Sequence, residues 1–210
     1  MKLLLVLITD LVHGSCSTAS GGYGQMVNCG STQYMQGWCS SGNHADCCGG
    51  SCFHELTCCS DYSISRNNCY AKYGSSGQFL TCSAGSAIVG ACGSGSNADC
   101  SGRFFDEMYE ETGVMAEEEK KGSYTIAYCC DIGNLKLAPY GDWKTGGCGY
   151  TVSCRPNQLM TGLCGSGGIG GGSCSPVPNL RQERIEAEEA DTRGCSASGV
   201  YTGIQCTDVL

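Results

Sequence analysis

The chain has 210 residues, among them 20 cysteines and 33 glycines, and its formal net charge is −8. Cysteine at roughly a tenth of the chain excludes an ordinary cytosolic enzyme unless the cysteines hold metal. The acidic balance excludes nucleic acid as the expected partner, because phosphate binding needs basic patches.

Residues 1–14 have the pattern of a short secretory signal peptide. Met1 and Lys2 supply a positive start, an apolar run follows over 3–9, and Val12 and Gly14 precede a cleavage position before Ser15. This run is shorter than the roughly 18 apolar residues of a membrane anchor, so no membrane insertion is expected. The alternative is a disordered or buried N-terminus. With the signal, the protein is predicted to be secreted and extracellular, where an even number of cysteines forms disulfides.

Three segments of the mature chain, about 15–68, 69–147 and 148–210, repeat one pattern within a single disulfide-rich domain. Alternating apolar and polar residues predict a first strand over 25–29, 78–82 and 150–154. A second strand is predicted over 34–39, 87–92 and 159–164, with a glycine two positions before its final cysteine, which marks a bulge or a close backbone approach. A closing strand ends at the cysteines near 59, 130 and 206. The fold class is therefore all-β, a threefold repeat of short antiparallel strands.

Two insertions interrupt the second and third segments before their closing strands. Residues 104–121 and 180–193 are rich in helix-favouring Glu, Ala, Met and Arg, so each predicts a short acidic helix. Equivalent insertions in a repeat protein fall on one face. They hold more than half of the 20 acidic residues: Asp106, Glu107, Glu110, Glu111, Glu117, Glu118, Glu119, Glu183, Glu186, Glu188, Glu189 and Asp191.

Equivalent cysteines are expected to pair in equivalent ways, although spacing alone does not fix connectivity. In this scheme the second and third cysteines of a segment pair across a turn, and the first pairs with the closing cysteine. The cysteine before each segment takes the other member of the doublet. The predicted pairs are Cys39–Cys47, Cys92–Cys100, Cys164–Cys174, Cys29–Cys59, Cys82–Cys130, Cys154–Cys206, Cys16–Cys58, Cys69–Cys129, Cys148–Cys195 and Cys48–Cys52.

The segments resemble the unit of the vitelline-membrane outer-layer protein family. The shared pattern is a cysteine, seven residues and a glycine, as in 29–37, 82–90 and 154–162, and Gly141-Asp142-Trp143 is similar to the family's lead-in. The resemblance implies a three-sheet β-prism and an extracellular coat protein of lectin-like architecture. The doublets Cys58-Cys59 and Cys129-Cys130 also resemble those of galaxin-like matrix proteins.

Catalytic and metal-binding groups are scarce in the sequence. His44 and His54 are the histidines that follow the signal, and both are expected in exposed loops, so a catalytic triad has little support. Zinc is the alternative use of the cysteines, but their adjacent pairs lack the spacing of zinc knuckles. The chain is therefore predicted to be no enzyme and to need no cofactor.

Loosely bound calcium is the one metal that the sequence suggests. Asp46 and Asp99 occupy matching turn positions, and oxygen-rich turns can bind calcium; the alternative is that each bonds its own backbone. The glutamate clusters can attract calcium through their summed negative charge without forming a defined binding site. The alternative for these clusters is a solvated helix face.

Two functions from different classes follow from these features. The first is a secreted, disulfide-stabilised structural protein of an extracellular coat or matrix, with matrix proteins or glycans as partners. The alternative is a lectin-like carbohydrate-binding module, in which Trp143, expected in a loop, and Tyr140 stack on sugar; Trp38 is expected in the core. A defence or toxin-like protein is a weaker alternative, since such proteins are more often small and basic. The oligomeric state is not predicted.

Overall fold

The computed structural model describes residues 15–22, 24–40, 47–60, 64–93, 100, 125–133, 135–147, 149–165, 174 and 202–210. These residues form three four-stranded antiparallel sheets and contain no helix. The predicted all-β class is therefore confirmed for this part of the chain. The predicted signal at 1–14, both acidic insertions, His44, Asp46 and Asp99 lie outside the described residues.

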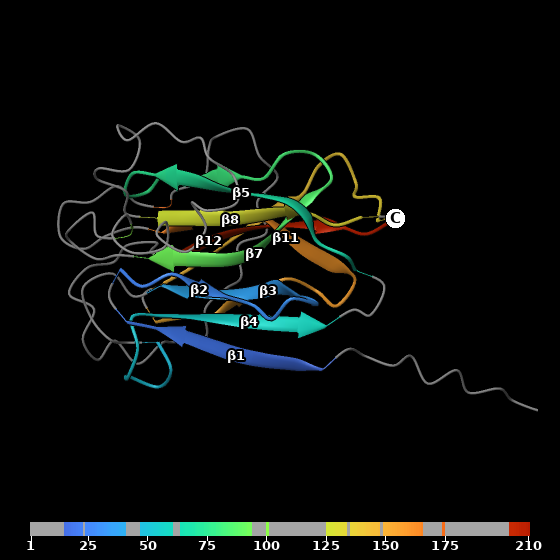
Figure 1. Cartoon of the computed structure of the whole chain (residues 1–210). Helices are drawn as coiled ribbons and strands as arrows, with labels where there is room; N and C mark the ends of the chain where they lie inside the picture. Colours follow the sequence, from blue (N-terminus) through green and yellow to red (C-terminus); the bar gives the residue numbers. More distant parts are fainter. Residues whose placement is uncertain are drawn as a thin grey trace, which may run out of the picture.

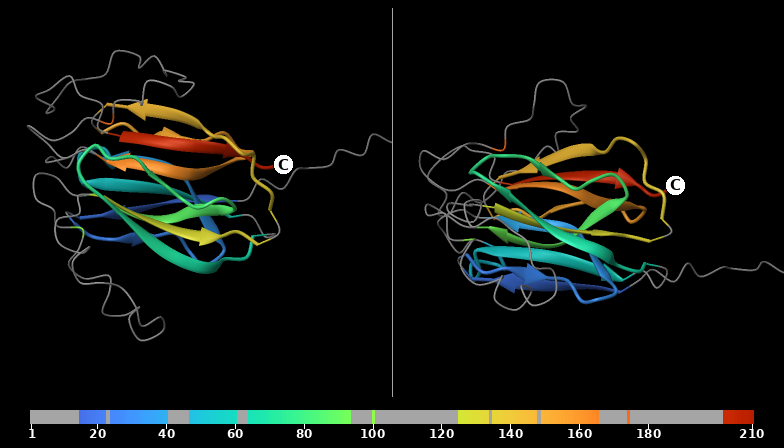
Figure 2. Two further views of the ribbon diagram at one scale, coloured as in Figure 1. Left: turned by 90° about the horizontal axis from the view of Figure 1, so that it is seen from above. Right: turned by 45° about the horizontal axis from the view of Figure 1, so that its top comes forward.

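The three sheets have the same order of strands, which we call lead, closing, central and short. The first is β1 (Cys16–Gly21), β4 (His54–Ser60), β3 (Gln33–Ser40) and β10 (Val152–Ser153). The second is β5 (Asn67–Gly74), β8 (Thr125–Asp131), β7 (Ser86–Gly93) and β2 (Val27–Asn28). The third is β9 (Asp142–Gly146), β12 (Thr202–Asp208), β11 (Gln158–Gly165) and β6 (Leu80–Thr81). Their strands run roughly along one common direction (Figures 1 and 2).

Each sheet borrows its short strand from another part of the chain. The strand β2, from the first segment, completes the second sheet; β6, from the second, completes the third; and β10, from the third, completes the first. The sheets are thereby linked in a closed cycle. The prediction of three strands for each segment is wrong in two respects: the first predicted strand is only two residues long and joins a neighbouring sheet, and the lead strands β1, β5 and β9 were missed.

A glycine bulge in each central strand makes this exchange possible. The register shifts between Met35 and Gly37 in β3, and the same shift occurs in β7 and β11. The bulged residue Gln36 accepts a hydrogen bond from the Cys154 amide at 2.8 Å, and the equivalent bonds join Cys29 to Val89 and Cys82 to Thr161. A Cβ on Gly37 would lie 2.7 Å from the hydroxyls of Thr57 and Ser153. The predicted bulge and close approach are both confirmed.

The core lies between the sheets and draws on all three of them. Each short strand supplies one apolar side chain, and each central strand supplies two. The buried cluster consists of Val27, Cys29, Met35, Trp38, Leu56, Cys58, Leu80, Cys82, Ile88, Ala91, Ala127, Cys129, Val152, Cys154, Met160, Leu163, Ile204 and Cys206. Because six of these residues are cysteines, disulfides occupy core volume that larger apolar side chains take up in other proteins.

Candidate functional site

The disulfide framework is the main chemical feature of the molecule. Nine disulfides join the described cysteines, and none of these cysteines is free. Predicted pairs confirmed by the structure are Cys39–Cys47, Cys48–Cys52, Cys92–Cys100, Cys154–Cys206 and Cys164–Cys174. The predicted pair Cys148–Cys195 lies outside the described residues.

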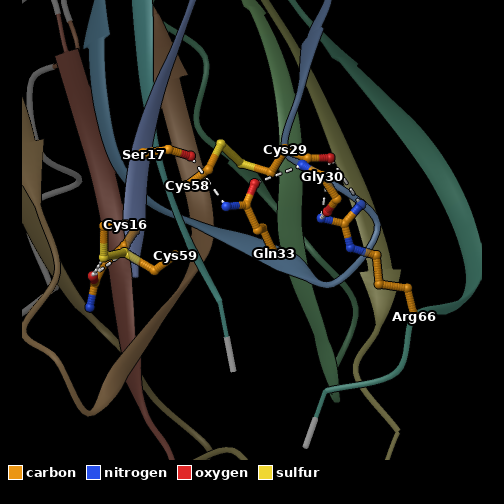
Figure 3. Close-up of a disulfide and its surroundings, with 9 residues drawn as sticks. Cys16, Ser17, Cys29, Gly30, Gln33, Cys58, Cys59 and Arg66 are labelled. Atoms are coloured by element: carbon orange, nitrogen blue, oxygen red, sulfur yellow. Dashed lines mark hydrogen bonds between the residues drawn. A yellow bond between two sulfur atoms is a disulfide. The ribbon is translucent and has the colours of Figure 1, made fainter. Parts of the chain in front are cut away.

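The two cysteine doublets pair the opposite way to the prediction. Successive residues of a strand face opposite sides of the sheet. Cys58 shares the inner face of β4 with buried Leu56 and bonds to Cys29 in the core, whereas Cys59 lies on the opposite face, in a second buried cluster, and bonds to Cys16 on β1 (Figure 3). The predicted pairs Cys29–Cys59 and Cys16–Cys58 are therefore wrong.

The second sheet repeats this arrangement and needs the same correction. Cys129 points into the core beside Ala127 and bonds to Cys82, while Cys130 bonds to Cys69 on β5. The predicted pairs Cys82–Cys130 and Cys69–Cys129 are wrong for the same reason.

The third sheet has an inner disulfide but no outer one. Cys154–Cys206 is its core pair, and the positions of the outer pair are occupied by Gly141 and Thr207. A Cβ on Gly141 would lie 2.7 Å from the Cys206 carbonyl oxygen and closer still to the Thr207 hydroxyl, so a side chain fits there only if the backbone shifts. The glycine of the lead-in motif is thus a packing requirement.

A polar clamp surrounds the first core disulfide (Figure 3). The Arg66 guanidinium donates to the Gly30 carbonyl at 2.6 Å and to the Cys29 carbonyl at 3.4 Å. The Gln33 side chain accepts from the Gly30 amide at 3.0 Å and donates to the Ser17 hydroxyl at 3.2 Å. These contacts fix the turn that follows Cys29 against both β1 and the chain entering β5. Desolvation lowers the pKa of Arg66, and the nearby Tyr128 acts in the opposite direction.

His54 is buried, not exposed in a loop as predicted. It begins β4, its side chain is 0% exposed, and its ring lies 5.4 Å from that of Trp38. Neither ring nitrogen has a hydrogen-bond partner in the described part of the chain. Desolvation lowers the pKa of His54 from 6.5 to about 4, with the Gln25 backbone acting in the other direction. A neutral histidine sealed from solvent cannot reach a substrate.

Threonines occupy the positions equivalent to His54 in the other two sheets. Thr202 donates to the Ser40 carbonyl at 3.2 Å and accepts from its amide at 3.1 Å, and Thr125 donates to the Gly165 carbonyl at 3.2 Å. Each bond joins the first residue of a closing strand to the last residue of the central strand of another sheet, at one end of the scaffold. Segments 94–124 and 166–201, which contain the acidic insertions, begin and end there.

The two predicted sugar-stacking residues differ sharply in exposure. Trp143 lies in the strand β9 rather than in a loop, is 3% exposed, and packs edge-on against Phe79 with ring centroids 4.4 Å apart. It covers the bulge glycine Gly162, so it cannot stack on a ligand, and that prediction is wrong. Tyr140 is 87% exposed and remains a candidate. Trp38 is buried, as predicted.

One group of potential metal ligands lies among the described residues. The side chains of Cys48, Cys52 and Glu55 offer atoms within 4.8 Å of one another. The two sulfur atoms are bonded to each other, and a disulfide does not supply the thiolates that metals bind.

Comparisons with known proteins identify no relative of this chain. A scan against protein-family models, a search of curated proteins and a search of solved structures each found no match. Among the described residues, no helix has the length and apolar character needed to cross a membrane.

Proposed function

We propose that this protein is a secreted structural component of an extracellular coat or matrix. The observation that carries the proposal is the disulfide framework, in which every described cysteine is paired. Disulfides at this density form and persist in oxidising extracellular environments. The signal-like pattern of residues 1–14 supports the same compartment.

The finer fold that we propose is β-prism-like. Three sheets of equivalent strand order around one shared core support it, as does the cyclic exchange of short strands. The described residues that flank the two insertions pair as Gly93 with Thr125 and Gly165 with Thr202, and Thr125 donates a hydrogen bond to the Gly165 carbonyl. Matrix proteins or glycans are the partners that we propose for this end of the sheets, with loosely bound calcium as a bridging ion.

The proposed role is non-catalytic. His54 is buried and uncharged at neutral pH, and the described cysteines are consumed in disulfides, so neither supplies a catalytic base or nucleophile. What the arrangement offers instead is durability, since each disulfide contributes about 2–4 kcal/mol to stability.

Fractionation of the producing tissue or culture tests this proposal. An antibody against the chain should detect it in the insoluble extracellular fraction, retained in salt. Chaotrope or chelator should release it without a reductant, because the described cysteines have no thiol left for links to other chains. Recovery from the cell interior, or as a freely soluble protein only, would overturn the matrix role.

A lectin-like role is a second candidate, which the exposure of Tyr140 favours. Aromatic rings that project into solvent are typical platforms for sugar faces, and 87% exposure leaves this ring without a packing role. A glycan and chitin binding screen with calcium or with chelator should then give saturable binding that Tyr140→Ala abolishes. Tyr150→Ala, at a half-exposed ring, is the matched control. Absence of binding in both conditions would remove this candidate.

A further inference from the structure

The lead strand β1 differs from its two counterparts in how far it is exposed. Lead strands form one edge of each sheet, and an open edge presents unpaired amides and carbonyls to any other strand. Four of the six residues of β1 are exposed, whereas β5 is mostly half-buried and β9 carries two buried side chains. Figure 1 shows β1 at the outer limit of the first sheet.

Protective features found on the other two lead strands are missing from β1. The register of β5 breaks between Asn67 and Tyr70, with Asn68 at a φ of 46°, and such a bulge disrupts further pairing. Strand β9 carries Asp142 and Lys144, and charges discourage strand addition. In contrast, β1 has the sequence Cys-Ser-Thr-Ala-Ser-Gly, has no charge, and pairs with β4 over six residues without a register shift.

Corner contacts reinforce this difference. The ammonium of Lys144 bonds to the Ser153 carbonyl at 3.0 Å, and that of Lys72 bonds to the Thr81 carbonyl, so each lysine joins its lead strand to the short strand of the next sheet. The register places Ala19 at the equivalent position of β1. Its methyl group makes no such bond and packs against the core instead.

The hydrogen-bonding pattern identifies which groups face the open edge. The Cα atoms of Cys16 and Cys59 are 4.0 Å apart, as in a pair that exchanges no backbone hydrogen bonds, and the Ser60 amide donates to the Ser15 carbonyl at 3.2 Å. Residues 15, 17 and 19 therefore bond to β4. The amides and carbonyls of Thr18 and Ser20 point away from β4 and toward the edge of the sheet.

We infer that the edge of β1 binds the same edge of a second copy of this chain, antiparallel and about a two-fold axis. An antiparallel strand is self-complementary under such an axis, so both copies use identical groups. No like charges meet, because the side chains along β1 are small and uncharged, despite the net charge of −8 on the chain. The product is one continuous sheet made from two four-stranded sheets.

Sedimentation equilibrium of the oxidised protein, as secreted by a eukaryotic host, tests this inference. The mean mass should rise with concentration from one copy to two, with a dissociation constant between about 1 μM and 1 mM, as expected for a small interface. Thr18→Pro removes an edge-facing amide but no bond to β4, and it should raise this constant by about tenfold or more. Thr18→Val, which keeps the amide, is the control and should dimerise like the wild type.

A second variant and a second readout distinguish loss of the dimer from misfolding. Thr18→Lys keeps the backbone intact and places like charges opposite each other, so it should weaken the dimer in the same direction as Thr18→Pro. Hydrogen exchange should show the Thr18 and Ser20 amides unprotected in dilute protein and protected in concentrated protein.

Three outcomes would overturn the inference: a constant monomer mass, a dimer that both variants leave intact, or protection of these amides at every concentration. The last outcome would mean that another segment of the same chain covers the edge. Dimerisation in dilute solution and retention in a matrix are separate measurements, so either can fail while the other stands.

Discussion

At the scale of single residues, burial of His54 makes the first sheet sensitive to acid. The pKa of this histidine is about 4 in the folded protein and about 6.5 in the unfolded chain. Between these values the unfolded chain binds the proton and the folded protein does not, so the free energy of unfolding falls as pH drops from 6.5 to 4. The loss is about 3 kcal/mol.

The variant His54→Thr isolates this contribution from that of the carboxylates. Thr125 and Thr202 show that threonine fits the equivalent positions. Urea unfolding of the wild type and of His54→Thr from pH 7 to pH 4 should give curves that diverge by about 3 kcal/mol, with the wild type losing more. Parallel curves would contradict the buried, neutral state of His54.

The two disulfides of the first doublet test whether core packing or chain entropy contributes more to the stability that a disulfide provides. The core pair Cys29–Cys58 closes a separation of 29 residues and the outer pair Cys16–Cys59 one of 43. Loop entropy alone makes the outer pair more stabilising by about 0.3 kcal/mol. Both cysteines of the core pair are buried, whereas Cys16 of the outer pair is exposed, so removal of the core pair leaves the larger cavity, which costs more than this difference.

We therefore expect the double variant C29A/C58A to be less stable than C16A/C59A by about 1 kcal/mol or more. Denaturant unfolding without reductant measures both, and paired substitution leaves no free thiol in either variant. An equal or opposite order would mean that the unfolded chain, rather than the core, decides the value of these bonds.

At the scale of elements, two lysines stabilise the corners between sheets. Lys144 is buried and bonds to the Ser153 carbonyl, whereas Lys72 is half-buried. Lys144→Met should cost about 1–3 kcal/mol because it leaves a carbonyl unsatisfied, and Lys72→Met should cost less because water can replace its ammonium. Lys136→Met is the control, expected within about 0.5 kcal/mol of the wild type in thermal unfolding. Equal effects of all three would refute the corner role.

The strands that the sequence predicted correctly are the central and closing strands, most of whose residues are buried. Their apolar residues and the repeated cysteines near their ends made them predictable, and the bulge glycines marked the close approaches. The lead strand β1 has no apolar alternation because its outer face is exposed. The sequence predicted no strand over 142–146, so Trp143 was expected in a loop. Local patterns also do not show to which sheet a two-residue strand belongs.

The candidate sites were predicted less well, for related reasons. The pairing of the doublet cysteines could have been predicted from the alternation of side chains between the two faces of a strand, since Leu56 and Cys58 must share a face and Cys59 must lie on the other. The burial of His54 depends on Trp38 and on the backbone near Gln25, which lie far from it in the sequence. Such a contact leaves no local signal.

At the scale of the whole molecule, the cyclic strand exchange makes the three sheets interdependent. The first sheet lacks its short strand without residues 152–153, and its core side chains pack against those of the other two sheets. The chain should therefore unfold in one cooperative transition, with equal calorimetric and van't Hoff enthalpies.

A fragment of residues 15–68 tests this interdependence directly. It contains β1, β3 and β4 with all four of their disulfides, so chain entropy favours its folding as far as cross-links can. However, Trp38, Leu56 and Met35 would face water in the absence of the other sheets, and exposure of each large apolar side chain costs about 1.5–3 kcal/mol. We expect the oxidised fragment to show no cooperative thermal transition and little amide protection in β3. A sharp transition with protected β3 amides would mean that one segment folds alone, and that the shared core and the borrowed strand add stability without being required for the fold.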